Sequence, residues 1–384
     1  MNPLYETMTT SVFERMSLAA SKHGALNLGQ GFPDFGWREE IIEAAATGLR
    51  EGSNQYAPSR GLPILREAVA DHYRRHQSIE LAAENVCVTS GATEAIAAAI
   101  FATLEPGDEV IVMTPAYDAY VPLVRRAGGV VREVALRPPE WRIEHEALAA
   151  AVTPRTRAII LNNPHNPTGR LFDDGELGVV AAIAREHELI VIADEVWEHV
   201  LLDGQRFTPF AAINGMVERT LKCGSAGKIF SLTGWKIGWL VAAPELAQLG
   251  ARAHQFLTFA SPPNLQAAVA FGLNEGDGWL NPMRSGFAAA RDRMVAGLQA
   301  ADFAVLPSSA TYFLCVDLAA SGIAADDEAF AARAVAEAGV AVVPLSSFAE
   351  VSPSTDLVRL CFAKRDTTID SGVAALERAR ALFS

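Results

Sequence analysis

Residues 157–194 read RAIILNNPHNPTGRLFDDGELGVVAAIAREHELIVIAD, and this stretch decides the fold. Two short apolar segments within it, 157–163 and 189–194, are rich in β-branched residues, and each ends in a polar side chain. Short apolar strands that alternate with helices are typical of a mainly parallel sheet covered by helices on both faces. We therefore predict an α/β fold with a large, doubly wound sheet.

The same pattern continues on both sides of this stretch. Further strand-like segments, several of them separated by helical stretches, lie at 85–90, 108–114, 129–136, 219–225 and 237–243. A helix is expected at 61–76, where apolar residues recur at helical spacing and Pro63 stands near the start. These segments belong to a large domain, which we place at 45–281.

A smaller unit follows the large sheet. Residues 282–301 have the length of a long helix, and the later segments alternate between strand and helix patterns. The expected strands are at 311–318, 340–345 and 357–363, with a helix near 327–338. We predict a smaller α/β domain made of 282–384 together with the N-terminal segment 1–44.

Composition and charge limit the classes of partner. The 384-residue chain carries 32 basic and 45 acidic residues, and its net charge of −13 repels nucleic acid and anionic membranes. It contains no run near the roughly eighteen apolar residues of a membrane helix. Residues 1–17 show neither a secretory signal nor a transit peptide. We expect a cytoplasmic protein with no nucleic-acid or membrane partner.

The cysteines and histidines give no metal-binding pattern. The four cysteines are scattered in apolar or strand-like contexts: Cys87, Cys223, Cys315 and Cys361. They form no Cys-x-x-Cys pair, so buried thiols are expected. His72 and His76 have helical i,i+4 spacing, but arginines surround them and no acidic third ligand is nearby. We predict that this pair lies on a solvated helix face and that the protein has no metal site.

A lysine stands in an unusual setting at 224–239, GSAGKIFSLTGWKIGW. Lys228 is surrounded there by small, apolar and aromatic residues, where a protonated amine is costly to bury. Three interpretations are open at this point: a surface lysine that snorkels to water, a structural ion pair, or a nucleophile. Such surroundings lower the pKa of an amine, which Schiff-base chemistry with a carbonyl requires.

The segment TSGATEA at 89–95 joins a predicted strand to a predicted helix. Small residues there leave backbone N–H groups open to a phosphate at the positive end of the helix dipole. An ordinary tight turn explains the Ser-Gly pair equally well. Ser225 and Lys236, which flank Lys228, are candidates for the hydroxyl and the cation that a phosphate site also needs.

Two charged residues lie in buried strands. Asp194 ends one strand, where it needs a cation or a hydrogen-bond donor, although capping of the next helix is an equally common role. Arg359 lies inside the apolar strand 357–363 and suits a carboxylate, although an internal salt bridge is the alternative. Ligands of open α/β sheets bind beyond the carboxyl ends of the strands, so we expect Asp194, Lys228, Asn162 and Asn166 to share one crevice.

Seven motifs, in this order along nearly the whole chain, resemble those of the fold-type I pyridoxal-phosphate aminotransferases of class I/II. They are NLGQGFPDF, NQYAPSRGLPILREA, TSGATEA, NNPHNPTG, ADEVWEH, SAGKIFSLTGWKIGW and LVRLCFAK. The resemblance is strongest to the branch of kynurenine, glutamine and methionine aminotransferases and of succinyldiaminopimelate aminotransferases. It implies an aspartate-aminotransferase-like fold and pyridoxal 5′-phosphate as cofactor.

The resemblance also implies roles for single residues. Lys228 matches the lysine that holds the cofactor as an aldimine and moves the α-proton, and Asp194 matches the carboxylate at the pyridine nitrogen. Asn166 matches the donor to the ring 3′-oxygen. Arg359 matches the clamp on the substrate α-carboxylate, over which the backbone at Gly31 closes.

The remaining positions concern the ring, the phosphate and the partner subunit. The resemblance implies that Tyr117 stacks on the ring and that the phosphate is shared by Gly91, Ala92, Thr93, Ser225 and Lys236. It implies a homodimer in which Tyr56 reaches the partner's cofactor. Trp197 departs from the family pattern, which has a tyrosine there; an indole N–H can donate one hydrogen bond but cannot ionise. Phe13 and Phe259 are expected to help form an apolar substrate pocket, although packing in the core is a fair alternative for both.

The implied activity is transfer of the amino group of an L-amino acid to a 2-oxo acid by a ping-pong cycle. A cysteine-conjugate β-lyase and a succinyldiaminopimelate-type aminotransferase are the alternatives, because the same fold and lysine support them. A transcriptional regulator would need an added basic DNA-binding segment. A nicotinamide dehydrogenase is disfavoured, because no Gly-x-Gly-x-x-Gly opens a first βαβ unit.

Overall fold

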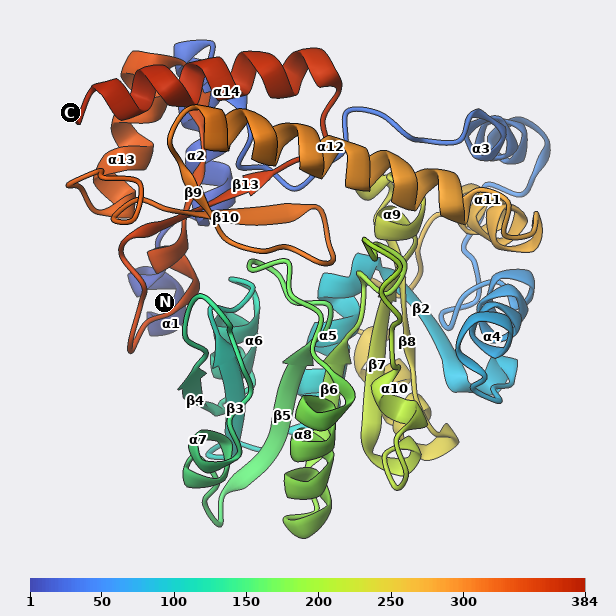
Figure 1. Ribbon diagram of the computed structural model, residues 1–384. Coiled ribbons are helices and arrows are strands. Elements are labelled where there is room, and N and C mark those ends of the chain that lie inside the picture. The colour runs from blue at the N-terminus through green and yellow to red at the C-terminus, as the bar shows by residue number, and fades with distance from the viewer. Residues whose placement is uncertain (384) are drawn as a thin grey trace.

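The computed structural model describes residues 1–383, and its largest element is a seven-stranded sheet (Figure 1). In sheet order the strands are β2 (Val86–Ser90), β8 (Ile237–Val241), β7 (Thr220–Ser225), β6 (Ile190–Asp194), β5 (Thr156–Asn162), β3 (Glu109–Thr114) and β4 (Val130–Ala135). Neighbouring strands are parallel except for β8, which runs antiparallel to β2 and β7. The prediction of a large, mainly parallel sheet is confirmed.

Helices cover both faces of this sheet, as the two-sided apolar strands require. Ala158 and Ile160 of β5 pack in one core cluster with α5 (Gly91–Thr103), α6 (Tyr120–Arg126) and α10 (Pro244–His254). Ile159 and Leu161, the alternating residues of the same strand, pack in a second cluster with α7 (His145–Ala150) and α8 (Asp174–Glu186). The alternation follows from the period of two in a β-strand.

The C-terminal part of the chain forms a smaller unit above the sheet in Figure 1. Its four strands, all antiparallel to their neighbours, are β12 (Val343–Pro344), β13 (Leu357–Cys361), β10 (Phe313–Asp317) and β9 (Ala304–Val305). Its helices are α12 (Leu280–Ala300), α13 (Asp327–Arg333), a π-helical continuation η5 (Ala334–Ala338), and α14 (Asp366–Ala381). The prediction of a second, smaller α/β unit is confirmed.

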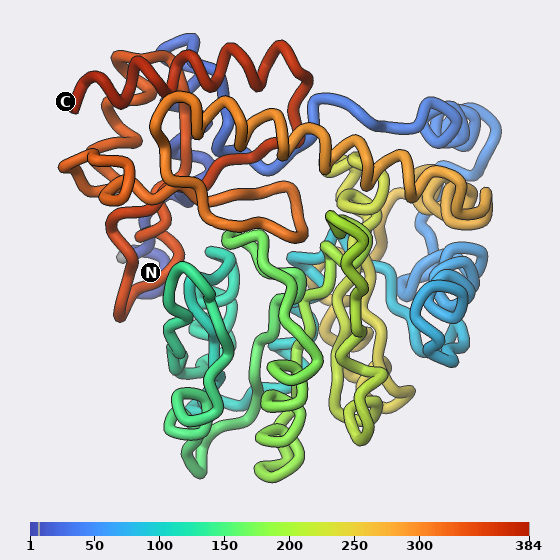
Figure 2. Tube along the Cα trace, viewed as in Figure 1, coloured from blue at the N-terminus to red at the C-terminus, as the bar shows by residue number. Residues whose placement is uncertain are grey.

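The N-terminal segment lies against this smaller unit. Strand β1 (Leu26–Asn27) pairs in parallel with β11 (Val340–Ala341), and Figure 2 shows the blue N-terminal chain beside the orange and red C-terminal chain. The predicted domain boundaries fall inside helices, at 44/45 in α3 (Glu39–Glu51) and at 281/282 in α12. The division of the chain at these positions stays a prediction.

The other helices are short or peripheral. They are α1 (Pro3–Thr7), α2 (Val12–His23), α4 (Pro63–Gln77), α9 (Ala226–Ile229) and α11 (Pro263–Asn274), with 3₁₀ turns at Ala83–Asn85, Phe210–Ala212, Val217–Arg219, Thr233–Trp235 and Leu345–Phe348. No helix within residues 1–383 is long and apolar enough to cross a membrane. All four cysteines are buried and unpaired, as expected.

The expectation for the histidine pair on α4 is wrong in one respect. His72 is buried, not solvated, and its Nε2 lies 2.7 Å from Nε2 of His199. The segment that follows β6 covers this face of α4, which the sequence of the helix alone does not reveal. Burial lowers the pKa of the His72 imidazole well below its usual value. The described residues contain no group of side chains that could hold a metal ion.

Close contact between β8 and the start of α5 depends on a glycine. A Cβ atom at Gly238 would lie 2.6 Å from the carbonyl carbon of Gly91 and 2.7 Å from the nitrogen of Ala92. Both of these atoms belong to the backbone, so neither can rotate away. The strand therefore approaches the helix closely only because residue 238 has no side chain.

We predict that Gly238→Ala lowers the free energy of unfolding by about 1–3 kcal/mol, because the added methyl group overpacks this junction. Gly178→Ala is the matched control. A Cβ at Gly178, inside α8, would meet no atom within 4 Å. The control should stabilise the protein by about 0.5–1 kcal/mol through helix propensity. Denaturant titrations measure both variants, and equal stability of the two would contradict the close approach.

Candidate active site

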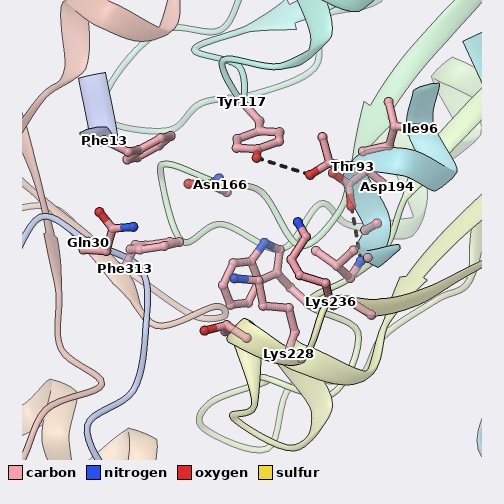
Figure 3. A pocket seen from close by; sticks show the side chains of 18 of the residues that line it. Phe13, Gln30, Thr93, Ile96, Tyr117, Asn166, Asp194, Lys228, Lys236 and Phe313 are labelled. Carbon is pink, nitrogen blue, oxygen red and sulfur yellow. Dashed lines mark hydrogen bonds between the residues drawn. The ribbon is translucent and has the colours of Figure 1, made fainter. Parts of the chain in front are cut away.

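A cavity of about 330 Å³ lies where the carboxyl ends of the large sheet face the smaller unit (Figure 3). Most of the residues that the sequence singled out line it: Phe13, Gly31, Gly91, Ala92, Thr93, Tyr117, Asn166, Asp194, Trp197, Ser225, Lys228, Lys236 and Arg359. Strands β2, β5, β6 and β7 all end at this place. The expected convergence at the carboxyl edge of the sheet is therefore observed.

Lys228 projects from α9, directly after β7, and its amine points into the cavity (Figure 3). Its Nζ donates a hydrogen bond to the hydroxyl of Tyr312 at 3.2 Å and lies 4.6 Å from the ring centroid of Trp197. Burial, together with the nearby Arg359 cation, lowers the pKa of this amine to about 8. None of the ion pairs in the described part of the chain includes Lys228, so the interpretation as a structural ion pair is not supported.

Asp194 ends β6 and is only 5% exposed. Its Oδ2 accepts a hydrogen bond of 2.5 Å from the hydroxyl of Tyr120, and its Oδ1 accepts a longer one of 3.4 Å from the Val196 N–H. Burial raises the pKa of the Asp194 carboxyl, whereas the Tyr120 donor lowers it. Because burial also raises the pKa of Tyr120, that phenol keeps its proton and acts as the donor.

Asn162 connects the two neighbouring strand ends. It lies opposite Asp194 in the register of β5 and β6, and its Nδ2 donates to the backbone oxygen of Asp194 at 2.9 Å. Its Oδ1 accepts from the backbone N–H of Asn166 at 2.8 Å. Asn162 is absent from the cavity wall, so it positions the loop that carries Asn166.

Arg359 lies in the middle of β13 and is 1% exposed. It donates from Nη1 to Oδ1 of Asn166 at 2.8 Å and from Nη2 to the oxygen of Gly29 at 2.6 Å, and its guanidinium lies 3.8 Å from the ring centroid of Phe313. Its Nε is buried without a partner. Burial lowers the pKa of Arg359 to about 10. No carboxylate among residues 1–383 pairs with it, so the cation is available to an anionic ligand.

The start of α5 forms an anion cradle. Gly91 opens the helix with a φ of +72°, and the first backbone N–H groups, at Gly91, Ala92 and Thr93, lie at its positive end. Lys236, with a φ of +54°, lies against this turn, since a Cβ at Gly91 would be 3.3 Å from its Nζ. Ser225 ends β7 on the same wall. Backbone donors, a hydroxyl and a cation thus suit a phosphate.

These groups fit a phosphorylated aromatic aldehyde. The anion cradle suits its phosphate, the Lys228 amine suits its carbonyl, and the Asp194 carboxylate suits a protonated ring nitrogen. The ring of Tyr117 lines the cavity, and its hydroxyl lies 3.5 Å from Oγ1 of Thr93 (Figure 3).

A family model, aminotransferase class I and II, matches residues 24–376. The chain belongs to this family. Enzymes of the family depend on pyridoxal 5′-phosphate, and this aminotransferase uses that cofactor, as the resemblance implied.

Relatives named as aminotransferases align over almost the whole chain. A probable N-succinyldiaminopimelate aminotransferase of Mycobacterium tuberculosis is 43% identical over 96% of this chain and 95% of its own. The methionine aminotransferase of Escherichia coli is 38% identical over 97% of this chain and 96% of its own. The solved structure of the Mycobacterium tuberculosis N-succinyldiaminopimelate aminotransferase superposes with a TM-score of 0.95 at 42% identity, covering 98% of this chain and 99% of that one. These likenesses confirm the fold-type I architecture.

Two predicted site residues lie outside the cavity of this aminotransferase. Tyr56 is 88% exposed and Phe259 is 46% exposed. Their rings make a T-shaped contact with centroids 5.7 Å apart. Tyr56 was expected to act in the partner subunit, whereas Phe259 was expected in the substrate pocket and does not line the cavity of its own chain.

Sequence reasoning missed several residues around the site. Tyr120 is the donor to Asp194, Tyr312 is the acceptor for Lys228, and Gln30 and Phe313 line the cavity. Tyr120 stands three residues after Tyr117 in a short segment with two tyrosines, which is a usable signal. Tyr312 lies in a segment that reads only as an apolar strand, so no local pattern marks it.

We predict that Tyr120→Phe weakens catalysis while the protein stays folded. Without the phenol, the pKa of Asp194 rises further, so less of the charged carboxylate is present and the acid limb of the pH–rate profile moves to higher pH. A hydrogen bond to a charged group is worth about 1.5–3 kcal/mol, which corresponds to a loss of about tenfold or more in kcat/KM. Tyr73→Phe, which removes an equally buried phenol elsewhere, is the control. An unchanged acid limb in Tyr120→Phe would contradict this role.

Proposed function

We propose that this aminotransferase moves the amino group of an L-amino acid with an uncharged side chain to a 2-oxo acid, with Lys228 as the catalytic amine. One observation carries the proposal: Lys228, Asp194 and Arg359 face a single cavity, and no ion pair in residues 1–383 neutralises any of them. Buried charges without partners are retained where a ligand completes them. The β-lyase alternative is not favoured by the relatives, which are named aminotransferases.

The residues have distinct tasks in the proposed reaction. Pyridoxal phosphate, when bound, supplies an electron-withdrawing ring that makes the α-proton of the amino acid acidic. With the cofactor bound, Asp194 would hold positive charge at the ring nitrogen, and Asn166 would donate to the ring 3′-oxygen. Lys228 takes and returns the α-proton through its Nζ, whose pKa of about 8 is close to neutral pH.

Recognition of the substrate carboxylate falls to Arg359. Its two Nη groups already have neutral acceptors, the amide of Asn166 and the backbone of Gly29, and its Nε has none. A carboxylate arriving here gains the interaction with a charge that is already desolvated and oriented. The backbone at Gly31, which also lines the cavity, closes over this end of the substrate.

The preferred substrate side chain follows from the cations that line the cavity and the tasks that they already have. The cations in the cavity wall are Lys228, Lys236 and Arg359, and each has a task at the amine, the phosphate or the α-carboxylate. The rings of Phe13 and Phe313 provide an apolar surface for a side chain. No further cation lines the described cavity to receive a distal carboxylate.

A panel of donors tests this substrate class. Methionine, glutamine, kynurenine and an aromatic amino acid are compared with N-succinyldiaminopimelate, each with several 2-oxo acids, and ranked by kcat/KM. Double-reciprocal plots of initial rate against donor concentration, at several fixed acceptor concentrations, should give the parallel lines of a ping-pong order. We expect the uncharged donors to rank first. A preference for N-succinyldiaminopimelate, the substrate in the name of the Mycobacterium tuberculosis relative, would overturn the side-chain proposal and leave transamination intact.

Borohydride reduction tests the catalytic amine. We expect the purified protein to be yellow and the reduced protein to carry a pyridoxyl mass on the peptide that contains Lys228. The Lys228→Ala variant should lose both the colour and the label. A label on any of the other lysines of the chain, Lys22, Lys222, Lys236 or Lys364, would refute the assignment.

We further propose a homodimer in which Tyr56 completes the partner's site. The phenol is 88% exposed, and Phe256 in the neighbouring loop after α10 is 85% exposed. Exposed aromatic residues grouped around the Tyr56–Phe259 contact are unusual on a surface that stays in water. A second copy of the chain would cover them.

Hybrid dimers test this arrangement. When equal amounts of Lys228→Ala and Tyr56→Ala chains are unfolded, mixed and then refolded together, half of the dimers are hybrids. If Tyr56 acts across the interface, each hybrid has one intact site, so the mixture should recover about a quarter of wild-type activity. If Tyr56 serves its own chain, no intact site forms and activity stays at the level of the separate variants.

A cytoplasmic location is part of the proposal. The four cysteines are free and buried, and the protein therefore has no disulfide that depends on an oxidising compartment.

A further inference from the structure

The amine of Lys228 has a hydrogen-bond partner from the smaller unit: it donates to the hydroxyl of Tyr312, at 3.2 Å. Residue 197, which also lies beside the amine, is an indole and offers no phenol. Tyr312 immediately precedes β10, on the sheet opposite the one that carries Lys228. A phenol therefore lies beside the amine although residue 197 provides none.

The direction of this hydrogen bond is fixed by a second one. The Tyr312 hydroxyl donates to the backbone oxygen of Gly31 at 2.8 Å. A carbonyl oxygen can only accept, so the single proton of the phenol is committed to Gly31. The phenol oxygen can then only accept from Lys228. The amine must give one N–H to Tyr312, which leaves its lone pair free to point elsewhere.

The phenol is held firmly in this orientation. Tyr312 is fully buried, and its ring packs against Trp197 at a centroid distance of 4.5 Å, Phe313 at 5.0 Å and Phe287 at 5.8 Å. Burial raises the pKa of the Tyr312 hydroxyl well above its usual value, so it stays protonated. The indole of Trp197 thus serves as a wall that holds the phenol beside the amine.

We propose that Tyr312 is a positioning residue for Lys228: it holds the free amine by one N–H and so turns the lone pair of the nitrogen toward the cavity. The proposal rests on the proposed role of Lys228 as the catalytic amine. The residue immediately before β10 thus orients an amine that projects from the large sheet.

The same phenol connects the amine to the segment over the substrate carboxylate. The oxygens of Gly29 and Phe32, on either side of Gly31, accept from Arg359 at 2.6 Å and from Lys364 at 2.8 Å. Residues 29–32 are therefore tied to the β13 region by two cations and to Lys228 through Tyr312. Because the Tyr312 hydroxyl is bonded to Gly31, a shift of residues 29–32 would also move the oxygen that accepts from Lys228.

The test measures the amine in the full-length chain freed of cofactor. The chain has five lysines, so carbon-13 at lysine Cε gives few signals, and Lys228→Arg assigns the one of interest. The titratable and charged groups that face this amine are Cys361 and Arg359 from β13, Asp194 from β6, and Lys236, and all remain in Tyr312→Phe. Loss of the phenol acceptor should lower the titration midpoint of Lys228 by about one pH unit, because the ammonium form loses a hydrogen bond.

Tyr73→Phe is the matched control for this titration. Tyr73 is as buried as Tyr312, and its hydroxyl bonds to Trp239 and Glu198, away from the cavity. It should leave the Lys228 midpoint unchanged. An equal shift in both variants, or no shift in Tyr312→Phe, would overturn the proposal.

A measurement on the unaltered chain guards against a variant that fails to fold. With carbon-13 at tyrosine Cζ, the Tyr312 signal should titrate with the same midpoint as Lys228, because the two groups share a hydrogen bond. An insensitive Tyr312 signal would contradict the contact.

In the holoenzyme, Tyr312→Phe should lower kcat about tenfold while KM changes by less than about twofold, because the lost contact concerns proton transfer. The isotope effect with an α-deuterated donor should increase. A merely structural role would leave the isotope effect unchanged. Borohydride labelling of Lys228 in the unaltered protein and in this variant separates the two hypotheses: a label absent from the unaltered protein would refute the catalytic amine, whereas a normal label in both with an unshifted titration would refute only the role of Tyr312.

Discussion

The guanidinium of Arg359, buried without an anion, is the constraint on which the arrangement of the site depends. Its two hydrogen bonds join β13 to the loop after β5 through Asn166 and to the N-terminal segment through Gly29. A buried cation is costly unless its donors are satisfied and a counter-charge is near. The protein provides neutral acceptors and the face of Phe313, and leaves the counter-charge to a ligand. An anion that binds here would therefore meet a cation that folding has already desolvated and oriented.

The segment after β6 shows how such charges are kept in place. Asp194 and Trp197 face the cavity, whereas Glu195 and Glu198 bond to the buried amine of Lys222 on the neighbouring strand β7. Site residues thus share one short segment with residues that pair inside the protein. Removal of one partner from a buried ion pair leaves the other as an uncompensated buried charge, which is costly. This cluster therefore favours a single conformation of the segment. The rigidity serves the orientation of Asp194.

The sequence predicted the features that depend on local pattern. The strands of the large sheet were recognised because apolar, β-branched residues bury both faces, and polar residues at their ends had to meet at one edge. Tyr312 and the burial of His72 were not predictable, because each depends on a distant segment that packs over it. The location of Phe259 outside the cavity has the same cause: the path of the loop after α10 is set by tertiary contacts, and its composition fits a pocket and a surface equally well.

Three parts of the chain meet at the amine of Lys228. The indole of Trp197 makes a T-shaped contact with Tyr312, whose hydroxyl lies 3.2 Å from the amine of Lys228. The amine comes from the large sheet, the phenol from the smaller one, and the carbonyl that orients the phenol from the N-terminal segment. The orientation of the amine therefore depends on how these three parts of the chain are packed together. A shift of the smaller unit relative to the large sheet would therefore change the hydrogen bond of the Lys228 amine, whereas the residues of the anion cradle all lie on the large-sheet side.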